Sequence, residues 1–494
     1  MSVFKKLAGE TALYGMSSIL ARLVNFLLVP LHTHVFTHRD EYGVIGQVYA
    51  WIALGIILYT LRLESAYFRY SSNDPTSTSY ANAKSSVTVI ALFLSFLLFI
   101  SADLVAGWLQ IPGYGQLVRF GAGIIAIDAI CELPFARLRL EKRPVKFVTI
   151  KIINILINVF LNYFLLWWAP KQGYAFFTES NKIVYVFLAN LAASVVTLLL
   201  LSKEYFTQGF ELNKKELIKI FSYALPLFIV GIAAVMNDSM TRQFLGWLVP
   251  GTSLDKQTLM GEYNACVKFG VFISLFVQAF RYAAEPFFFK HMHSDNARLD
   301  YSRITTYFTQ FMMIGFVAIL LYLDFIKHYV VRTPSYLNAI GVVPIVLLAN
   351  VFLGVYYNVS NWYRLTDRTR YGMYSAMIGV GLTILFNVLL VPRFNYYGTA
   401  WSMLICYLGM TVVTYLWGQK YYPVPYEVNK ILWIILGGIF IYVLSKALDS
   451  VLPQGIYLKL LIHSVLFGLF VLLFNRDMVK SLIVSFTGKS ASNP

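Results

Sequence analysis

The chain has 494 residues, of which 58% are hydrophobic and 13% charged, and its mean hydropathy is +0.64. Soluble globular proteins carry about 25% charged residues, so the composition excludes a soluble enzyme or binding module. The net charge of +16 would suit a nucleic-acid-binding protein, but the basic residues are concentrated in alternate loops. This alternation is typical of a membrane protein whose basic loops face the cytoplasm.

Apolar runs of about 18 to 25 residues recur along the chain, each long enough to cross a bilayer as a helix. We predict an all-α polytopic membrane protein with fourteen transmembrane helices, at residues 11–31, 42–62, 85–107, 117–138, 149–169, 183–202, 219–247, 263–289, 305–325, 337–362, 371–391, 398–418, 429–447 and 455–474. The first run is interrupted by Arg22, Asn25 and Pro30, so we interpret it as a span and not as a signal peptide. The even number of spans and the charge bias predict that both termini are cytoplasmic.

The chain aligns with itself at a shift of about 221 residues, which places Glu41-Tyr42 on Glu262-Tyr263 and Glu64 on Glu285. A shift of about 225 places Asn162 on Asn387. We interpret these matches as a tandem duplication that gives two six-helix lobes related by a pseudo-two-fold axis. The predicted parts are a first lobe at 1–205, a hinge-like cytoplasmic linker at 206–218, a second lobe at 219–425, and two extra helices with a tail at 426–494.

Several cations fall inside the predicted spans, where a charged side chain costs at least about 2.5–3.5 kcal/mol. Arg22 lies near the middle of the first span, and Lys268 and Arg281 lie in the eighth. We predict that these three line a positively charged cavity that binds a phosphate group, with Arg242 of the seventh span as a further candidate. Asp238 is four residues before Arg242, so the alternative is a self-neutralising pair on one helix face.

Acidic residues at membrane depth, Asp238 among them, are candidates for proton or cation coupling. Asp128 and Glu132 are four residues apart in the fourth span and share one face. Either they couple an ion such as H⁺ or Na⁺, or they form a buried salt bridge with a cation such as Arg22. Glu64 and Glu285 recur in both copies near helix ends, which predicts a structural or gating role.

Neutral polar residues form a stripe in the fifth span, at Asn154, Asn158 and Asn162. The stripe either holds helices together, which is common for asparagine in membranes, or makes a polar wall for sugars together with Asn25. The basic loops are topology signals and, secondarily, possible contacts for anionic lipid headgroups. His34 and His38 have the spacing of a helical metal pair but no third ligand is evident, so we predict no metal and no cofactor beyond a coupling cation.

The beginning of the chain resembles a known family. Lys5-Lys6-Leu7-Ala8-Gly9-Glu10-Thr11, Val29-Pro30-Leu31 and Glu41-Tyr42-Gly43 are similar to the start of bacterial polysaccharide-biosynthesis flippases, which belong to the multidrug/oligosaccharidyl-lipid/polysaccharide exporter superfamily. The resemblance implies an alternating-access flippase that moves undecaprenyl-diphosphate-linked oligosaccharide across the inner membrane, as a monomer that contacts membrane lipids and glycan polymerase or ligase machinery. The His32-Thr33-His34 stretch departs from the family pattern, so the resemblance implies nothing about the chemistry of the outer gate.

Three alternatives remain from the sequence. A lipid II flippase shares the expected fold and charges. A cation-coupled multidrug extruder is less favoured, because extruders usually stop at twelve spans and prefer an acid where this chain has Arg22. A membrane glycan polymerase or ligase needs a large outer loop with catalytic residues, and every outer loop here is short. We therefore predict a secondary transporter and not an enzyme, without a nucleic-acid partner.

Overall fold

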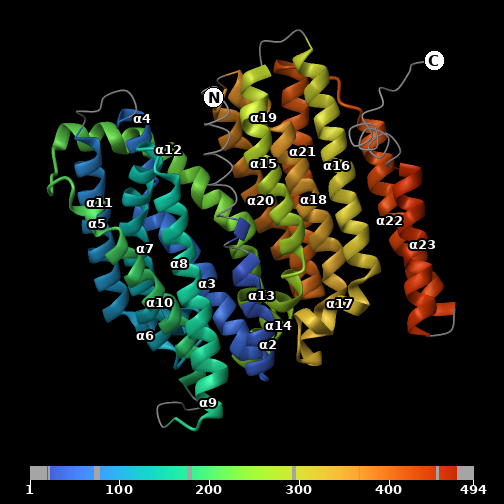
Figure 1. Cartoon of the computed structure of the whole chain (residues 1–494), viewed down its shortest axis with the longest axis horizontal. Helices are drawn as coiled ribbons and strands as arrows, with labels where there is room; N and C mark the ends of the chain where they lie inside the picture. The colour runs from blue at the N-terminus through green and yellow to red at the C-terminus, as the bar shows by residue number, and fades with distance from the viewer. Residues whose placement is uncertain are drawn as a thin grey trace.

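The structure is a computed structural model that describes residues 19–20, 23–71, 78–174, 181–291, 296–366, 368–451 and 455–474, and side chains within them except at 282–291. Every regular element in these ranges is helical. Figure 1 shows the helices in two side-by-side bundles, with two further helices beyond the second. This is the all-helical membrane fold that the hydropathy predicts.

The first bundle begins with one short apolar helix and continues with long helices joined by shorter ones. Its elements are α2 (Leu28–Val35), α3 (Arg39–Thr60), α4 (Leu63–Ser71), α5 (Ser79–Ile100), α6 (Ala102–Trp108), α7 (Gly115–Leu140), α8 (Pro144–Tyr163), η1 (Phe164–Trp168), α9 (Ala169–Lys171), α10 (Lys182–Leu200) and α11 (Ser202–Phe206). The α4 and α11 segments lie at one end of the molecule, and α6 and α9 lie at the other (Figure 1). We call the α4 end the basic end, because the basic α7–α8 connection is there, and the α9 end the outer end.

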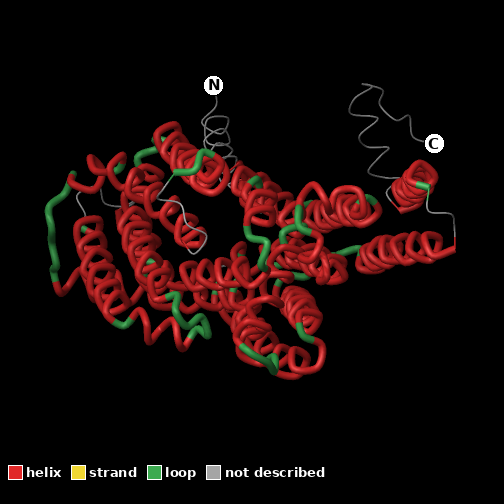
Figure 2. Tube along the Cα trace, turned by 90° about the horizontal axis from the view of Figure 1, so that it is seen from below, coloured by secondary structure: helices red, strands yellow, loops and turns green. Residues whose placement is uncertain are grey.

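The second bundle follows after α11. Its elements are α12 (Lys214–Asp238), η3 (Met240–Arg242), α13 (Gln243–Leu248), α14 (Ser253–Val267), α15 (Gly270–His291), α16 (Ala297–Leu321), α17 (Leu323–Val330), η4 (Pro334–Val342), α18 (Val343–Val359), α19 (Asn361–Leu365), α20 (Arg370–Phe394) and α21 (Tyr396–Tyr421). The two remaining helices, α22 (Val428–Val451) and α23 (Ile456–Phe474), pack on α16. Figures 1 and 2 place them at the edge away from the first bundle.

Among the described residues, fewer helices qualify as membrane-spanning than the sequence predicts. Eleven described helices are long and apolar enough to span, or twelve if the bent pair α14 and α15 is one span. The α7 helix is 26 residues long, but it carries Arg119, Asp128 and Glu132 and is not among them. The described part of the first predicted span is a shorter apolar helix, Leu23–Val35. The count of fourteen therefore stays a prediction.

The two bundles contact each other most extensively through α3 and α14. These helices carry the repeated Glu-Tyr pair, at Glu41-Tyr42 and Glu262-Tyr263. Equivalent helices that pack on one another are what a pseudo-two-fold axis between two copies would produce. The duplication itself and the residue bounds of the two lobes stay predictions.

The connection between the bundles is fastened to the first bundle by side chains of α5. Tyr80 Oη donates to the backbone oxygen of Glu204 (2.7 Å), and the Lys84 ammonium donates to the backbone oxygens of Tyr205 (3.1 Å) and Gly209 (3.2 Å). The next helix, α12, contacts α3, α4 and α5 as well as α20, and Figure 1 shows it crossing from one bundle to the other. The segment that follows α11 is therefore held against the first bundle in this conformation, and its role as a hinge stays a prediction.

Candidate functional site

A break in one transmembrane segment positions one of the predicted cations. The segment bends by 50° between α14 and α15, and Lys268 lies in the break. Gly270, at the start of α15, lies so close to α18 that a Cβ there would be 2.9 Å from Val346 and 3.0 Å from Asn350. Broken helices at membrane depth are typical of ion and substrate sites in transporters, because backbone groups are left free there.

Arg242 lies on the short η3 turn, where its guanidinium binds two neighbours. It donates to Asn264 Oδ1 (3.1 Å) and to the backbone oxygen of Ser239 (3.0 Å). The α12 helix ends at Asp238, so Asp238 and Arg242 are not on one continuous helix face. No ion pair within 4.0 Å joins them among the described residues. The predicted self-neutralising pair is therefore wrong, and the guanidinium is held by neutral oxygens.

Four charged side chains gather on this side of the second bundle. Lys268 interacts electrostatically with Arg242 and Asp238. The Arg281 guanidinium lies over the Tyr357 ring, 5.1 Å from its centroid, and Tyr357 also interacts with Asp238. Asp238 is exposed, whereas the three cations are half-buried. We call Asp238, Arg242, Lys268 and Arg281 the cation cluster. Its formal net charge is +2.

The cation cluster faces the first bundle. Arg242 interacts electrostatically with Tyr42 of α3, and Lys268 with His32 of α2. Nearby, the Phe26 ring packs edge-on against Phe272 of α15, with centroids 4.9 Å apart. The cluster thus lies where the two bundles meet, which is where the sequence places a binding cavity.

The outer side of this meeting point is closed by polar contacts between the bundles. The Arg39 guanidinium of α3 forms an ion pair with Glu262 of α14, and Glu262 also accepts from Asn338 (2.9 Å). Further along α3 and nearer the start of α14, Gln257 donates to Gln47 Oε1 (2.7 Å). These contacts join both bundles in one layer.

Two further contacts extend this closure. The backbone nitrogen of Arg332 donates to Thr33 Oγ1 (3.1 Å), and Tyr336 Oη donates to the backbone oxygen of Phe36 (2.6 Å). Both join the end of α2 to the segment around η4. Together with the α3–α14 layer they form what we call the outer closure.

Two glycines allow α3 and α14 to approach this closely. A Cβ at Gly43 would overlap the backbone oxygen of Gln257, and a Cβ at Gly261 would overlap that of Arg39. Small residues at helix crossings permit such backbone contact in membrane proteins. The outer closure therefore depends on the absence of these two side chains.

The predicted coupling acids lie inside the first bundle, apart from the cation cluster. Asp128 interacts with Lys151 of α8 and with Tyr49 of α3. Among the described residues, neither it nor Glu132 forms an ion pair within 4.0 Å, so the predicted buried salt bridge is not formed there.

Glu64 lies on α4, beyond the end of the α3 span, and binds Arg62 at 3.2 Å. Burial, and then the nearby Glu132 carboxylate, raise the pKa of the Glu64 carboxyl despite Arg62. Glu64 thus lies at a helix junction, and its structural or gating role stays a prediction.

The asparagine stripe of α8 binds neighbouring helices. Asn154 donates to Thr197 of α10 (2.9 Å), and Asn162 binds His32 Nε2 (3.0 Å) and donates to Asn158 Oδ1 (2.9 Å). Asn162 is fully buried, so it cannot contact a sugar in this conformation and acts as a link between helices. Asn25, by contrast, is exposed.

The remaining predicted residues either lie outside the described residues or do not form the predicted arrangement. Arg22 and the side chain of Glu285 lie outside the described residues. His34 and His38 do not form a helical pair, because α2 ends at Val35. Within the ranges that the structure describes, no three His, Cys, Asp or Glu side chains could hold a metal ion.

Comparison with known proteins identifies the family. The family model for polysaccharide biosynthesis proteins matches residues 7–292, which is more than half of the chain. The chain belongs to the polysaccharide biosynthesis protein family. No curated protein sequence matches the chain.

Solved structures agree on the fold of this polysaccharide biosynthesis protein. The lipid II flippase MurJ in an inward closed conformation is similar with a TM-score of 0.74 at 13% identity, over 94% of this chain and 99% of that one. A multidrug resistance MATE transporter of the MOP superfamily, inward-facing, gives 0.56 at 13% identity over 81% and 97%. A Vibrio cholerae MATE transporter gives 0.52 at 14% identity over 84% and 95%. The protein is thus a multi-pass membrane protein with the fold of these flippase and transporter structures.

The contacts that join α3 to α14 could not be predicted from the sequence of this family member. The pairing of Arg39 with Glu262 and of Gln47 with Gln257 joins residues more than 200 positions apart. The repeated Glu-Tyr pair marked the right helices, but only the crossing of α3 and α14 reveals which residues meet.

Proposed function

We propose that this protein moves an undecaprenyl-diphosphate-linked oligosaccharide, a repeat unit of O-antigen, capsule or exopolysaccharide, from the inner to the outer leaflet of the bacterial cytoplasmic membrane. The observation that carries the proposal is the cation cluster at the meeting of the two bundles, where Lys268 lies near Arg242 and Asp238, and Arg281 lies over Tyr357. A diphosphate supplies the negative charge that this surplus of cations would bind. Membership of the polysaccharide biosynthesis family supports a glycan as the cargo.

The mechanism follows from the cost of moving a polar head through lipid. The isoprenoid tail stays in the hydrocarbon, while the diphosphate and sugars need a polar passage between the bundles. With the outer closure formed, the substrate would enter from the basic end, which the positive-inside bias assigns to the cytoplasm together with both termini. Separation of α3 from α14 would then expose the head to the outer side, in the manner of alternating access.

Within this passage, each charged residue has a distinct role. Lys268, at the helix break, and Arg242, fixed by Asn264 and Ser239, would bind the phosphate oxygens, with Arg22 and Arg281 as further contacts. Asp238 is exposed beside them, so it is placed to exchange a proton or Na⁺ as the phosphates leave. Asp128 and Glu132 remain candidates for coupling from within the first bundle.

Lys268→Gln and Arg242→Gln test the proposal in cells. A charge-assisted hydrogen bond contributes about 1.5–3 kcal/mol, so each variant should lower surface glycan formation roughly 10- to 100-fold, with lipid-linked oligosaccharide accumulating on the cytoplasmic side. Lys214→Gln is the matched control, because Lys214 is exposed at the start of α12. Wild-type surface glycan from both cluster variants, at equal protein abundance, would overturn the proposal.

Lipid II is the second candidate cargo, since the MurJ structure aligns over nearly the whole of both chains. The two cargoes share the diphosphate and differ in the sugar and peptide that follow it. Growth of cells depleted of their lipid II flippase, rescued by this protein, would favour lipid II. Failure to rescue, together with loss of surface glycan on deletion, would favour the oligosaccharide.

A further inference from the structure

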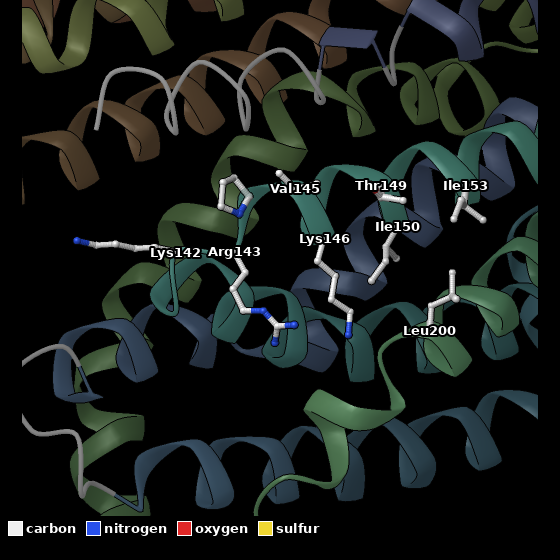
Figure 3. Close-up of a pocket in the computed structure, with 9 residues that line it drawn as sticks. Lys142, Arg143, Val145, Lys146, Thr149, Ile150, Ile153 and Leu200 are labelled. Carbon is white, nitrogen blue, oxygen red and sulfur yellow. The ribbon is translucent and has the colours of Figure 1, made fainter. Parts of the chain in front are cut away.

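We propose that the first bundle carries a binding site for an anionic glycerophospholipid at its basic end, separate from the cation cluster. A pocket of about 590 Å³ lies between the start of α8 and the end of α10. Its lining combines three cations, Lys142, Arg143 and Lys146, with the apolar side chains of Ile150, Ile153 and Leu200 (Figure 3). This is the chemistry of a phosphate head joined to a hydrocarbon chain.

A buried carboxylate holds two of these cations at the pocket wall. Lys146 Nζ lies 2.7 and 2.8 Å from the two carboxylate oxygens of Glu204, and Arg143 Nη1 lies 3.0 Å from one of them. The Glu204 side chain is 2% exposed, whereas those of Lys146 and Arg143 are 30% and 44% exposed. Glu204 thus fixes both cations from beneath and leaves them accessible from the pocket. In Figure 3 their side chains point the same way, while Lys142 extends away from both.

The charges around the pocket leave a surplus for a ligand. The neighbouring cations and carboxylates are Arg137, Lys142, Arg143 and Lys146 against Glu141 and Glu204, with Glu141 bound to Arg137 (2.6 Å) and Arg143 (3.5 Å). Four cations against two carboxylates give a net charge of +2. A phosphodiester carries one negative charge, so an anionic headgroup is accommodated and a zwitterionic one is not favoured.

The remainder of the pocket extends toward the membrane. Residues Lys146 and Ile153 are separated by about two helical turns of α8, or about 10 Å along its axis, and α8 is a membrane-spanning helix. Among the described residues of the lining, Thr149 is the one neutral side chain with a hydrogen-bonding group. The pocket therefore offers almost nothing to a sugar, which argues for a phospholipid and against the glycan substrate. Basic clusters next to a leaflet attract anionic lipids.

Native mass spectrometry of the full chain in detergent tests the site. Phosphatidylglycerol and phosphatidylcholine with the same acyl chains are compared, and glycerol 3-phosphate tests the headgroup without a tail. The variant is Lys142→Gln with Arg143→Gln. The matched control is Lys214→Gln with Lys215→Gln, which removes two exposed cations of the same end at the start of α12.

The expected preference of the wild type for phosphatidylglycerol is lost in the pocket variant and kept in the control. A basic residue near a leaflet contributes about five-fold in affinity, so two contribute about 30-fold. Lys142→Gln alone should cost about five-fold, and it removes no ion pair within 4.0 Å among the described residues. Glycerol 3-phosphate should not bind at the concentrations at which phosphatidylglycerol binds.

Four results would overturn the assignment. They are no preference for phosphatidylglycerol in the wild type, an unchanged preference in the pocket variant, an equal loss in the control, and saturation by glycerol 3-phosphate alone. Displacement of phosphatidylglycerol from this pocket by lower concentrations of undecaprenyl diphosphate would also overturn it, and would make the pocket an entry site for the substrate. Surface glycan output is measured separately, because the lipid site stands whether or not the proposed cargo is correct.

Discussion

Substitution of Gly261 by Ala should open the outer closure. In an ordinary exposed helix position, Gly to Ala stabilises by about 1 kcal/mol. At Gly261 the added Cβ would overlap the backbone oxygen of Arg39, and a backbone oxygen cannot move unless the whole of α3 moves. Gly261→Ala is therefore expected to destabilise the closed conformation, although helix propensity alone would favour alanine.

The magnitude follows from the contacts that separation of α3 and α14 would break. These are the Arg39–Glu262 ion pair, the Gln47–Gln257 hydrogen bond and the bond from Lys256 to Gln110 (3.1 Å). Polar contacts between membrane helices contribute about 0.6 kcal/mol each on average. Three such contacts amount to about 2 kcal/mol, which shifts the ratio of closed to open molecules about 30-fold.

Spin-label distances across the outer end measure this shift. Lys171→Cys on α9 and Tyr329→Cys on α17 place exposed labels on the two bundles at that end (Figure 1). The three native cysteines, Cys131, Cys266 and Cys406, are buried, so the introduced residues react selectively. The wild type should give one short distance, and Gly261→Ala should add a longer one.

Gly381→Ala on α20 is the matched control, because a Cβ there meets nothing within 4 Å. It should keep the wild-type distance and leave thermal stability equal or slightly higher. A folded Gly261→Ala protein with the wild-type distance would refute the argument that backbone contact sets the closure.

Three further substitutions test individual contacts that hold neighbouring helices together. Although burial opposes ionisation of Glu204, the hydrogen bond from Lys146 lowers the pKa of its carboxyl. The ionised carboxylate therefore stabilises the folded protein above the unfolded-state pKa of about 4.3. This stabilisation is lost as the pH falls through the lower folded-state pKa. Glu204→Gln should lower the unfolding free energy by roughly 1–3 kcal/mol at pH 7, and a gap to wild type that does not narrow below about pH 4 would contradict this sign. Asp324 accepts from three lysines on α17, α22 and α23 at 2.7, 3.5 and 3.0 Å. Asp324→Asn should therefore loosen α22 and α23 and speed trypsin cleavage after Lys446 and Lys459, and unchanged cleavage at these two lysines would count against this clamp. Asn162→Ala removes the bond to His32 and should cost about 0.6 kcal/mol with transport intact, whereas transport lost at full stability would restore the sugar-wall hypothesis.

The sequence predicted some site residues because a buried charge is visible in hydropathy alone. Lys268 and Arg242 stand out for this reason, and the structure brings them within electrostatic range of each other. The alternative that Asp238 and Arg242 pair on one helix face is wrong, because the end of α12 cannot be located from an apolar run that continues beyond it. The asparagine stripe likewise has the right helical period, but its partners His32 and Thr197 come from other helices.

What the sequence by itself determined is the membrane class, the helical content and the alternation of basic loops. These depend on the cost of placing polar groups in lipid, which each segment meets alone. Only the tertiary structure decided that α3 and α14 touch through Gly43 and Gly261, that the connection is fastened by Lys84, and that α22 and α23 pack on α16. Those features depend on which distant side chains meet, and lipid gives little hydrophobic force to reveal it, so small residues and a few polar contacts decide the packing.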